Sequence, residues 1–231
     1  MIAAGVSWFA LPNAPTYVIP AFANSASIIL WAFVVGPIAG LASVGYVLMV
    51  TWADRHRPKG WGRITPPIIV IGALGIVSIW FPQILGNGKD ISQLAFTGQI
   101  APLLLLVLLV LKPAATILCM RSGAPGGMFT PSLGGVLGLL WSHFWPGAQP
   151  GIFALLGAGA VVGATTQSPI SAVVSMMELT GRDRSFILTM LRVVGIATLT
   201  ARSVDARSIY DVRLTDEEIE QRQKQRDLPS Q

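Results

Sequence analysis

Residues 122–177 contain no Asp, Glu, Lys or Arg. About 25% of residues in soluble domains are charged, so an uncharged run of this length is not expected in a protein surrounded by water. The run also holds glycine clusters at 126–127, 134–135 and 157–159, and prolines at 125, 131, 146, 150 and 169. Such a composition is typical of short, broken, closely packed helices inside a membrane bundle, where irregular backbone must be buried or line a wet cavity. Segments of this kind point to a transport site.

The rest of the chain also favours the bilayer. Hydrophobic residues make up 52% of the 231 residues and charged residues only 12%, and the mean hydropathy is +0.63. One domain of this size cannot hide that much apolar surface from water, whereas lipid can accommodate it. We therefore predict an all-α, polytopic membrane protein of tilted and broken helices. Further apolar runs predict membrane helices at residues 25–52, 64–85, 94–111 and 185–201. Lys112-Pro113 is expected to interrupt the third run, which resumes through Cys119.

The charged residues gather in loops and at the C-terminal end. Residues 54–63 form a basic loop, which the positive-inside rule places in the cytoplasm. Residues 215–231 are polar, so we divide the chain into a membrane region (1–214) and a cytoplasmic tail (215–231). The net charge of +5 is distributed as in membrane proteins, which argues against nucleic-acid binding. No basic segment precedes the first apolar stretch, so no cleavable signal peptide is predicted.

The sequence offers little for catalysis or metal binding. It contains one Cys and two histidines far apart in sequence, His56 and His143. This excludes a disulfide framework and disfavours a Cys- or His-based metal centre. No catalytic acid pair, H-E-x-x-H motif or Ser-His-Asp set can be assembled from two distant histidines and few carboxylates, so a membrane enzyme is a weak alternative. We predict no catalytic residue, no metal and no organic cofactor.

The best-defined motif is the break Ser122-Gly-Ala-Pro-Gly-Gly-Met-Phe-Thr-Pro131. Gly123, Gly126 and Gly127 permit a tight turn and close approach of backbone to a bound group. Pro131 suits the first turn of a helix, which we expect to continue through 133–140. The backbone N–H groups of Met128, Phe129 and Thr130 would then be unpaired at the positive end of the helix dipole, where an anion can bind. On these residues alone, a tight turn between packed helices is the favoured interpretation and an anion site is the alternative.

The nonapeptide GAPGGMFTP at 123–131 resembles the second-half signature of the CLC family of voltage-gated chloride channels and chloride/proton antiporters. Other segments resemble the family in the same order: HRPKG, GNGKD, ATTQSPISAVVSMMELTG and the Ser208-Ile209-Tyr210 tripeptide. The resemblance covers about residues 10–215. It implies the second inverted-repeat half of a CLC-type fold in the cell membrane and chloride or another small anion as the bound partner.

The resemblance also implies individual roles. The backbone amides of Met128 and Phe129 and the hydroxyl of Tyr210 would coordinate chloride, with Gly123, Gly126, Gly127, Thr130 and Pro131 shaping the helix start. Taken alone, Tyr210 is typical of an interfacial tyrosine. Glu178, at the end of the uncharged run, is a functional candidate as an intramembrane acid. The following Thr180-Gly181-Arg182 predicts a helix end near the surface, so a capping or packing role is favoured. Arg192 is expected to snorkel or pair.

The chain departs from the family in one respect. Neither a GSGIP-like loop nor a GREGP-like segment is found, so the resemblance covers only the second half. We therefore expect an incomplete transport path and a missing N-terminal half, and cannot assign channel or antiporter. The alternative is a non-conducting membrane subunit, or a truncated remnant, that needs a partner half. The resemblance further implies a homodimer in the complete protein, with helices 151–177 and 186–201 near its interface, surrounded by membrane lipid.

Overall fold

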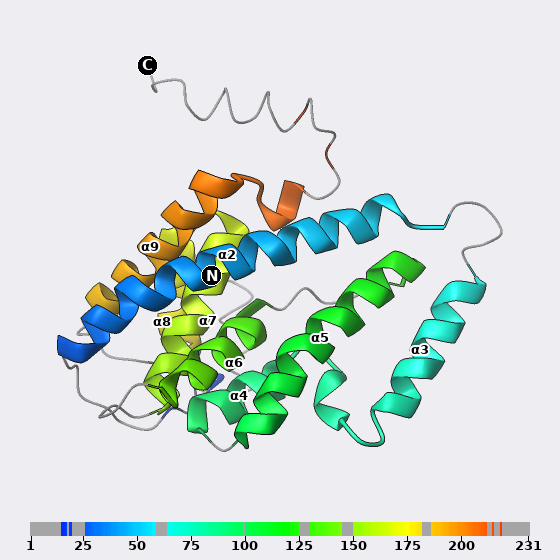
Figure 1. The fold of residues 1–231 in the computed structure, drawn as a ribbon, viewed down its shortest axis with the longest axis horizontal. Helices are drawn as coiled ribbons and strands as arrows, with labels where there is room; N and C mark the ends of the chain where they lie inside the picture. The colour runs from blue at the N-terminus through cyan, green and yellow to red at the C-terminus, as the bar shows by residue number, and fades with distance from the viewer. Residues whose placement is uncertain are drawn as a thin grey trace, which may run out of the picture.

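The computed structural model describes residues 15–17, 19, 26–58, 64–98, 100–124, 130–144, 150–181, 186–211, 214 and 218. Over these residues the chain forms helices and turns, and no strand (Figure 1). The α-helices are α2 (Ala26–Arg55), α3 (Thr65–Val77), α4 (Lys89–Thr97), α5 (Pro102–Ser122), α6 (Thr130–Ser142), α7 (Pro150–Thr166), α8 (Pro169–Thr180) and α9 (Ile187–Val204). Two short 3₁₀ helices are η2 (Pro82–Ile84) and η4 (Ile209–Asp211). The predicted all-α class is confirmed for this part of the chain.

Helix α7 forms the centre of the bundle. It packs against α2, α4, α6, α8 and α9, and almost all of its residues are buried. Because α7 is largely enclosed by other described helices, the expected dimer interface would lie mainly on α8 and α9; the dimer itself stays a prediction. Those two helices do carry exposed apolar side chains, among them Ile170, Val174, Leu188, Leu191 and Leu199.

Glycines bring the central helices into backbone contact. Gly134 and Gly138 of α6 are four residues apart, and a Cβ atom at either would collide with the backbone of α7 at Gly157 or Phe153. This spacing of small residues is a common way for membrane helices to pack closely. The same device joins α2 to α9, where a Cβ at Gly36 would lie 2.7 Å from Ile196 Cγ2.

Three helices among the described residues are long and apolar enough to cross a bilayer. They are Leu30–Arg55 within α2, Pro102–Ser122 and Ile187–Val204. The first and third correspond to the predicted helices at 25–52 and 185–201. The short, apolar α7 and α8 follow the broken pattern expected of residues 122–177.

Two of the predicted membrane helices are wrong as single elements. The run 64–85 stops being α-helical at Val77, and Pro82 then begins η2. A proline lacks the N–H for the helix ladder and clashes with the carbonyl four residues earlier, so it favours a helix end at this place. The run 94–111 is divided by Gly98, which ends α4 with a φ of +71°, and α5 begins afresh at Pro102.

The expected interruption at Lys112-Pro113 is also wrong. Helix α5 continues through Pro113 to Ser122, because helices in membranes tolerate internal proline when their neighbours satisfy the freed carbonyl.

Helix α3 lies beside α5 at the edge of the bundle (Figure 1) and buries none of its residues.

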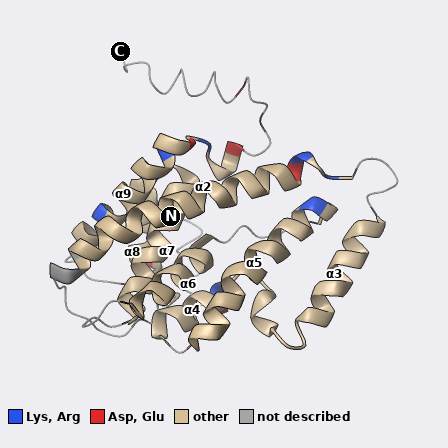
Figure 2. Ribbon diagram, in the orientation of Figure 1, with Lys and Arg blue, Asp and Glu red and all other residues tan. Residues whose placement is uncertain are grey.

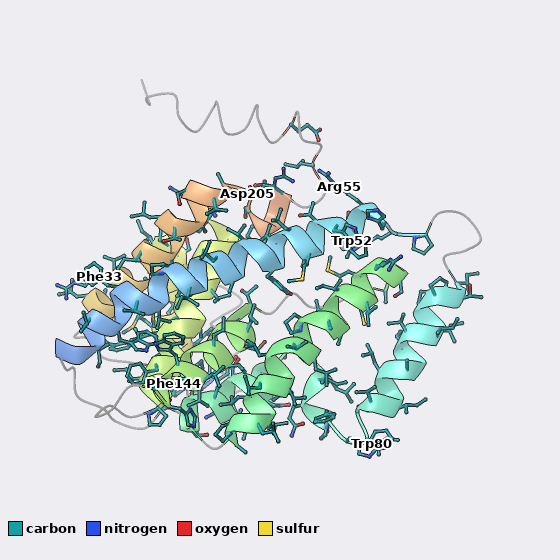
Figure 3. The ribbon with its side chains drawn as sticks, viewed as in Figure 1. Phe33, Trp52, Arg55, Trp80, Phe144 and Asp205 are labelled. Carbon is teal, nitrogen blue, oxygen red and sulfur yellow. The ribbon has the colours of Figure 1, made fainter. Side chains whose placement is uncertain are left out.

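Charged residues gather at one end of the bundle. In Figure 2, Lys, Arg, Asp and Glu colour the C-terminal ends of α2, α5 and α9. Figure 3 places Arg55 and Asp205 on this side and Trp80 on the opposite side. Here the Arg121 guanidinium lies 4.9 Å from the ring centroid of Trp52, so a cation–π contact joins the ends of α2 and α5.

Candidate functional site

The uncharged run opens with a well-formed helix end. Gly123 follows α5 with a φ of +94°. Its N–H donates to Met120 O at 3.1 Å, and the N–H of Ala124 donates to Cys119 O at 3.1 Å. This pair of bonds is the Schellman motif, which needs a left-handed residue at the glycine position. The predicted turn at Gly123 is therefore confirmed.

Helix α6 starts inside the bundle. Thr130 and Pro131 form its first turn, as the sequence predicts, and both are buried. The hydroxyl of Thr165, in the last turn of α7, lies 3.5 Å from the Thr130 hydroxyl while it donates its proton to Val161 O at 2.7 Å. The preceding residues Gly126, Gly127, Met128 and Phe129 lie outside the described residues, so the role of their backbone amides stays a prediction.

Tyr210 lies on η4, between the buried residues Ile209 and Asp211. Its own side chain is 75% exposed, and its role as a chloride ligand stays a prediction. The short helix is anchored from Ser208, whose hydroxyl donates to Thr166 O at 3.1 Å and whose N–H donates to Asp211 Oδ2 at 3.0 Å. The backbone around Tyr210 is thereby fixed even though its side chain is exposed.

The C-terminal end of α7 connects these two parts of the site. Thr165 contacts Thr130 at the start of α6, and the next residue, Thr166, accepts the hydrogen bond from Ser208. The fold therefore brings Thr130 and the helix of Tyr210, which are far apart in sequence, to the same end of one buried helix. Among the sequence-predicted residues, Thr130 and Pro131 lie at this end of α7, and Tyr210 follows on the adjoining η4 with its side chain exposed.

The sequence analysis missed a polar connection beside this point. Gln167 adopts a left-handed φ of +57°. Arg202, near the end of α9, donates from Nε to Gln167 Oε1 at 2.9 Å and from Nη2 to Gln167 O at 3.0 Å. The side-chain amide of Gln167 donates in turn to Ala164 O at 3.0 Å. The amide side chain of Gln167, two residues before Pro169 in an uncharged run, was the available signal, since such a group must find partners when it is buried.

The two ionisable residues considered from the sequence lie away from this junction. Glu178 is exposed in the last turn of α8, before the left-handed Gly181, so the predicted helix end at this point is confirmed. Arg192 is exposed on α9. Within the described part of the chain, no three His, Cys, Asp or Glu residues lie close enough together to hold a metal ion.

Comparison with known proteins gives a consistent result. The family model described as voltage gated chloride channel matches residues 1–202. The H(+)/Cl(-) exchange transporter ClcA of Vibrio parahaemolyticus is 26% identical over 226 residues, which cover 91% of this chain and 48% of that protein.

The fold is also similar to solved structures. A slow cyanobacterial Cl⁻/H⁺ antiporter superposes with a TM-score of 0.74 at 20% identity, covering 90% of this chain and 51% of the antiporter. A CLC-type fluoride/proton antiporter gives a TM-score of 0.71 at 21% identity, covering 91% and 52%. The chain thus spans about half the length of the proteins it matches.

Proposed function

This chain belongs to the voltage gated chloride channel family, and on that premise we propose that it carries chloride or another small anion across a membrane. It would act as part of a CLC-type channel or proton-coupled exchanger, and not as an enzyme. Support comes from relatives named as H(+)/Cl(-) exchange transporters and from the fold it shares with Cl⁻/H⁺ and fluoride/proton antiporters. We extend voltage gating to this chain because the matching family is described as voltage gated.

We propose that the anion is held where α6 begins. The ligands are the backbone N–H groups of Met128 and Phe129 and the hydroxyl of Tyr210. Gly123, Gly126 and Gly127 shape the turn that exposes these amides. One observation carries the assignment. At the C-terminal end of α7, Thr165 contacts Thr130, and the next residue, Thr166, accepts a hydrogen bond from Ser208.

The physical chemistry of this place suits a transported anion. The first N–H groups of a helix lack intrahelical partners, and the helix dipole adds partial positive charge there. The surrounding segment contains no Lys or Arg from 122 to 177, so the attraction comes from dipoles in a region of low dielectric constant. Dipoles bind an anion without holding it as strongly as a fixed cation would, which allows the ion to leave.

We also propose an orientation. The basic ends of α2, α5 and α9 lie on one side of the bundle (Figure 2), which the positive-inside rule assigns to the cytoplasm of a cell-membrane protein. The polar tail 215–231 would follow on the same side. Exposed apolar side chains on α8 and α9 would face lipid or the second subunit of a homodimer.

Because the chain covers about half of its relatives, we propose that a segment equivalent to their other half completes the transport path. The same coverage favours a second candidate, in which this chain is a membrane subunit that does not conduct by itself. The two differ in what happens when the other half is supplied.

Reconstitution into liposomes separates these candidates. Chloride efflux would be measured for the 231-residue chain alone and for the chain together with the other half of a relative. We expect little flux from the chain alone and selective chloride flux from the combination. Robust flux from the chain alone would contradict the need for a second half, and absence of flux from a stable, folded combination would contradict transport.

A further inference from the structure

A lysine in the middle of α5 is bound entirely to backbone carbonyls. Lys112 Nζ donates to Ile84 O at 2.6 Å, to Leu85 O at 3.2 Å and to Gly86 O at 2.8 Å. An ammonium group has three N–H donors, so all of them are used. Lys112 therefore holds the connection between η2 and α4.

The carbonyls at this place need such a partner. They belong to the end of the short helix η2 and to the turn after it, where the regular helix ladder does not continue. Ile84 is buried, and a buried carbonyl without a donor is costly. A single cation reaching across from α5 satisfies three of them at once.

The segment held by Lys112 rests directly on the start of α6. Gly88 has a φ of +93° and precedes the first residue of α4. A Cβ atom at Gly88 would lie 2.8 Å from Ser132 Oγ, 2.9 Å from Ser132 Cβ and 3.6 Å from Lys112 Cε. Ser132 is buried in the first turn of α6, so at Gly88 there is no room for a side chain between the turn and that helix.

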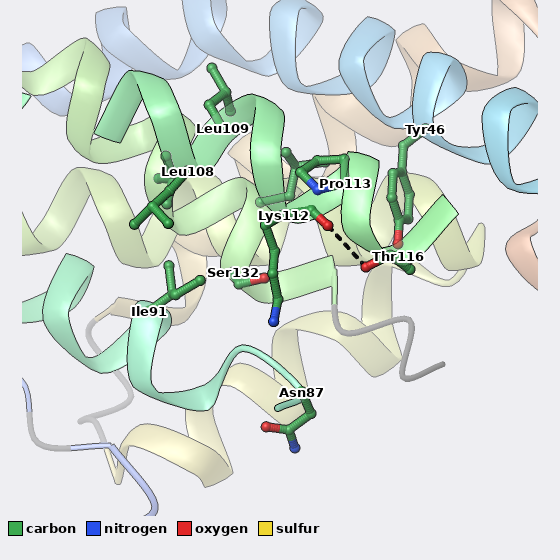
Figure 4. Close-up of a pocket in the computed structure, with 11 residues that line it drawn as sticks. Tyr46, Asn87, Ile91, Leu108, Leu109, Lys112, Pro113, Thr116 and Ser132 are labelled. Atoms are coloured by element: carbon green, nitrogen blue, oxygen red, sulfur yellow. Dashed lines mark hydrogen bonds between the residues drawn. The ribbon is translucent and has the colours of Figure 1, made fainter. Parts of the chain in front are cut away.

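These groups line one small pocket, shown in Figure 4. Asn87 comes from the turn, Lys112 and Thr116 from α5, and Ser132 from α6. The Thr116 hydroxyl donates to Lys112 O at 3.1 Å, the bond drawn dashed in the figure. Three segments distant in sequence thus meet around the lysine, next to the first turn of α6.

We propose that Lys112 is a positioning residue for the anion site: its ammonium group holds residues 84–88 against Ser132 and so fixes the start of α6. The effect of Lys112 on anion affinity rests on the proposed function, whereas its effect on the position of α6 does not. Loss of the ammonium releases the three carbonyls, loosens the turn and lets the first turn of α6 shift. Anion affinity then falls although no ligand has been removed.

Hydrogen–deuterium exchange tests the structural step in the purified protein. In Lys112→Met, which keeps the length of the side chain without its charge, we expect faster exchange at residues 84–92 and also at 133–138 of α6. Lys89→Met is the matched control, because Lys89 is an exposed lysine beside the same turn. Chloride titration of the same proteins should give an affinity about tenfold weaker for Lys112→Met and unchanged for Lys89→Met.

Chemical rescue identifies the ammonium as the cause. Cys119 is the one cysteine of the sequence, so Cys119→Ala provides a background in which Lys112→Cys can be modified alone. Alkylation with 2-bromoethylamine restores an ammonium at nearly the original reach, and methyl methanethiosulfonate adds a neutral group. We expect only the amine adduct to restore slow exchange and chloride affinity.

Unchanged exchange in α6 of Lys112→Met, or equal rescue by the neutral adduct, would overturn the proposal. If instead the parent protein binds no chloride while exchange in α6 still follows the ammonium, the proposed function fails and the positioning of α6 by Lys112 stands. If chloride affinity is intact in a Lys112→Met protein whose α6 exchanges faster, the positioning has no consequence for the anion and the proposal is refuted.

Discussion

The hydroxyl of Ser208 donates a hydrogen bond of 3.1 Å to the backbone carbonyl of Thr166. This contact joins the segment that carries Tyr210 to the end of α7, one residue from the threonine that contacts the start of α6. Two parts of the candidate site, contributed by distant segments, are therefore held by neighbouring residues of one buried helix. We therefore expect substitutions that break this contact to change anion affinity as well as the stability of the fold.

Replacing Ser208 by alanine tests this connection. The variant loses the hydrogen bond to Thr166 and leaves the backbone around Tyr210 less constrained. We expect chloride affinity to fall by about fivefold, since a neutral hydrogen bond contributes roughly 1 kcal/mol. Calorimetric titration measures the effect. Ser203→Ala is the control, because the hydroxyl of Ser203 bonds only to its own helix, at Thr200 O; the same loss in both variants would contradict the specific role of Ser208.

Arg202 and Gln167 provide a prediction about stability. The guanidinium makes two hydrogen bonds to Gln167, at 2.9 and 3.0 Å, and these tie the end of α9 to the junction of α7 and α8. We expect Arg202→Ala to lower the free energy of unfolding by about 1–2 kcal/mol. Thermal unfolding in detergent should show little change for Arg192→Ala, an exposed arginine on the same helix. If Arg202→Ala and Arg192→Ala lowered the stability equally, the Gln167 contact would not be the cause of the loss.

The packing of α6 on α7 provides a second prediction about stability. A Cβ atom at Gly134 would collide with the backbone of Gly157, so Gly134→Ala must push the two helices apart. Overpacking of this kind costs about 1–3 kcal/mol, and we expect a lower apparent melting temperature. Gly75→Ala is the matched control, since nothing lies within 4 Å of the added atom and alanine favours a helix over glycine by about 1 kcal/mol. A Gly134→Ala protein as stable as Gly75→Ala would show that α6 and α7 are less tightly packed than described.

The start of α6 could be predicted from sequence because its signals are local. Pro131 favours an early helical position, and the glycines before it mark a turn. The helix ends at Val77 and Gly98 were missed because apolar composition continues across both breaks. In a membrane protein, hydropathy indicates which segments contact lipid but not where a helix ends. Pro82 and Gly98 were the local signals of a break, but each lies within a run that is otherwise apolar.

The contacts that hold the candidate site together could not be predicted. Gln167 meets Arg202, and Lys112 meets the carbonyls of 84–86, across long separations in sequence. A lysine or arginine in an apolar run indicates that a partner exists but not which one. The ligand roles of Met128, Phe129 and Tyr210 rest on the family signature and remain predictions.

Chloride titration calorimetry on the purified protein tests the central claim most directly. Tyr210→Phe removes one hydrogen-bond donor and should weaken chloride binding by about tenfold without abolishing it. Pro131→Leu and Gly127→Leu should weaken binding more, because they move the helix start that presents the amides of Met128 and Phe129. The account predicts saturable chloride binding with this order of affinities. Chloride affinity equal to that of the parent protein in all three variants would contradict it.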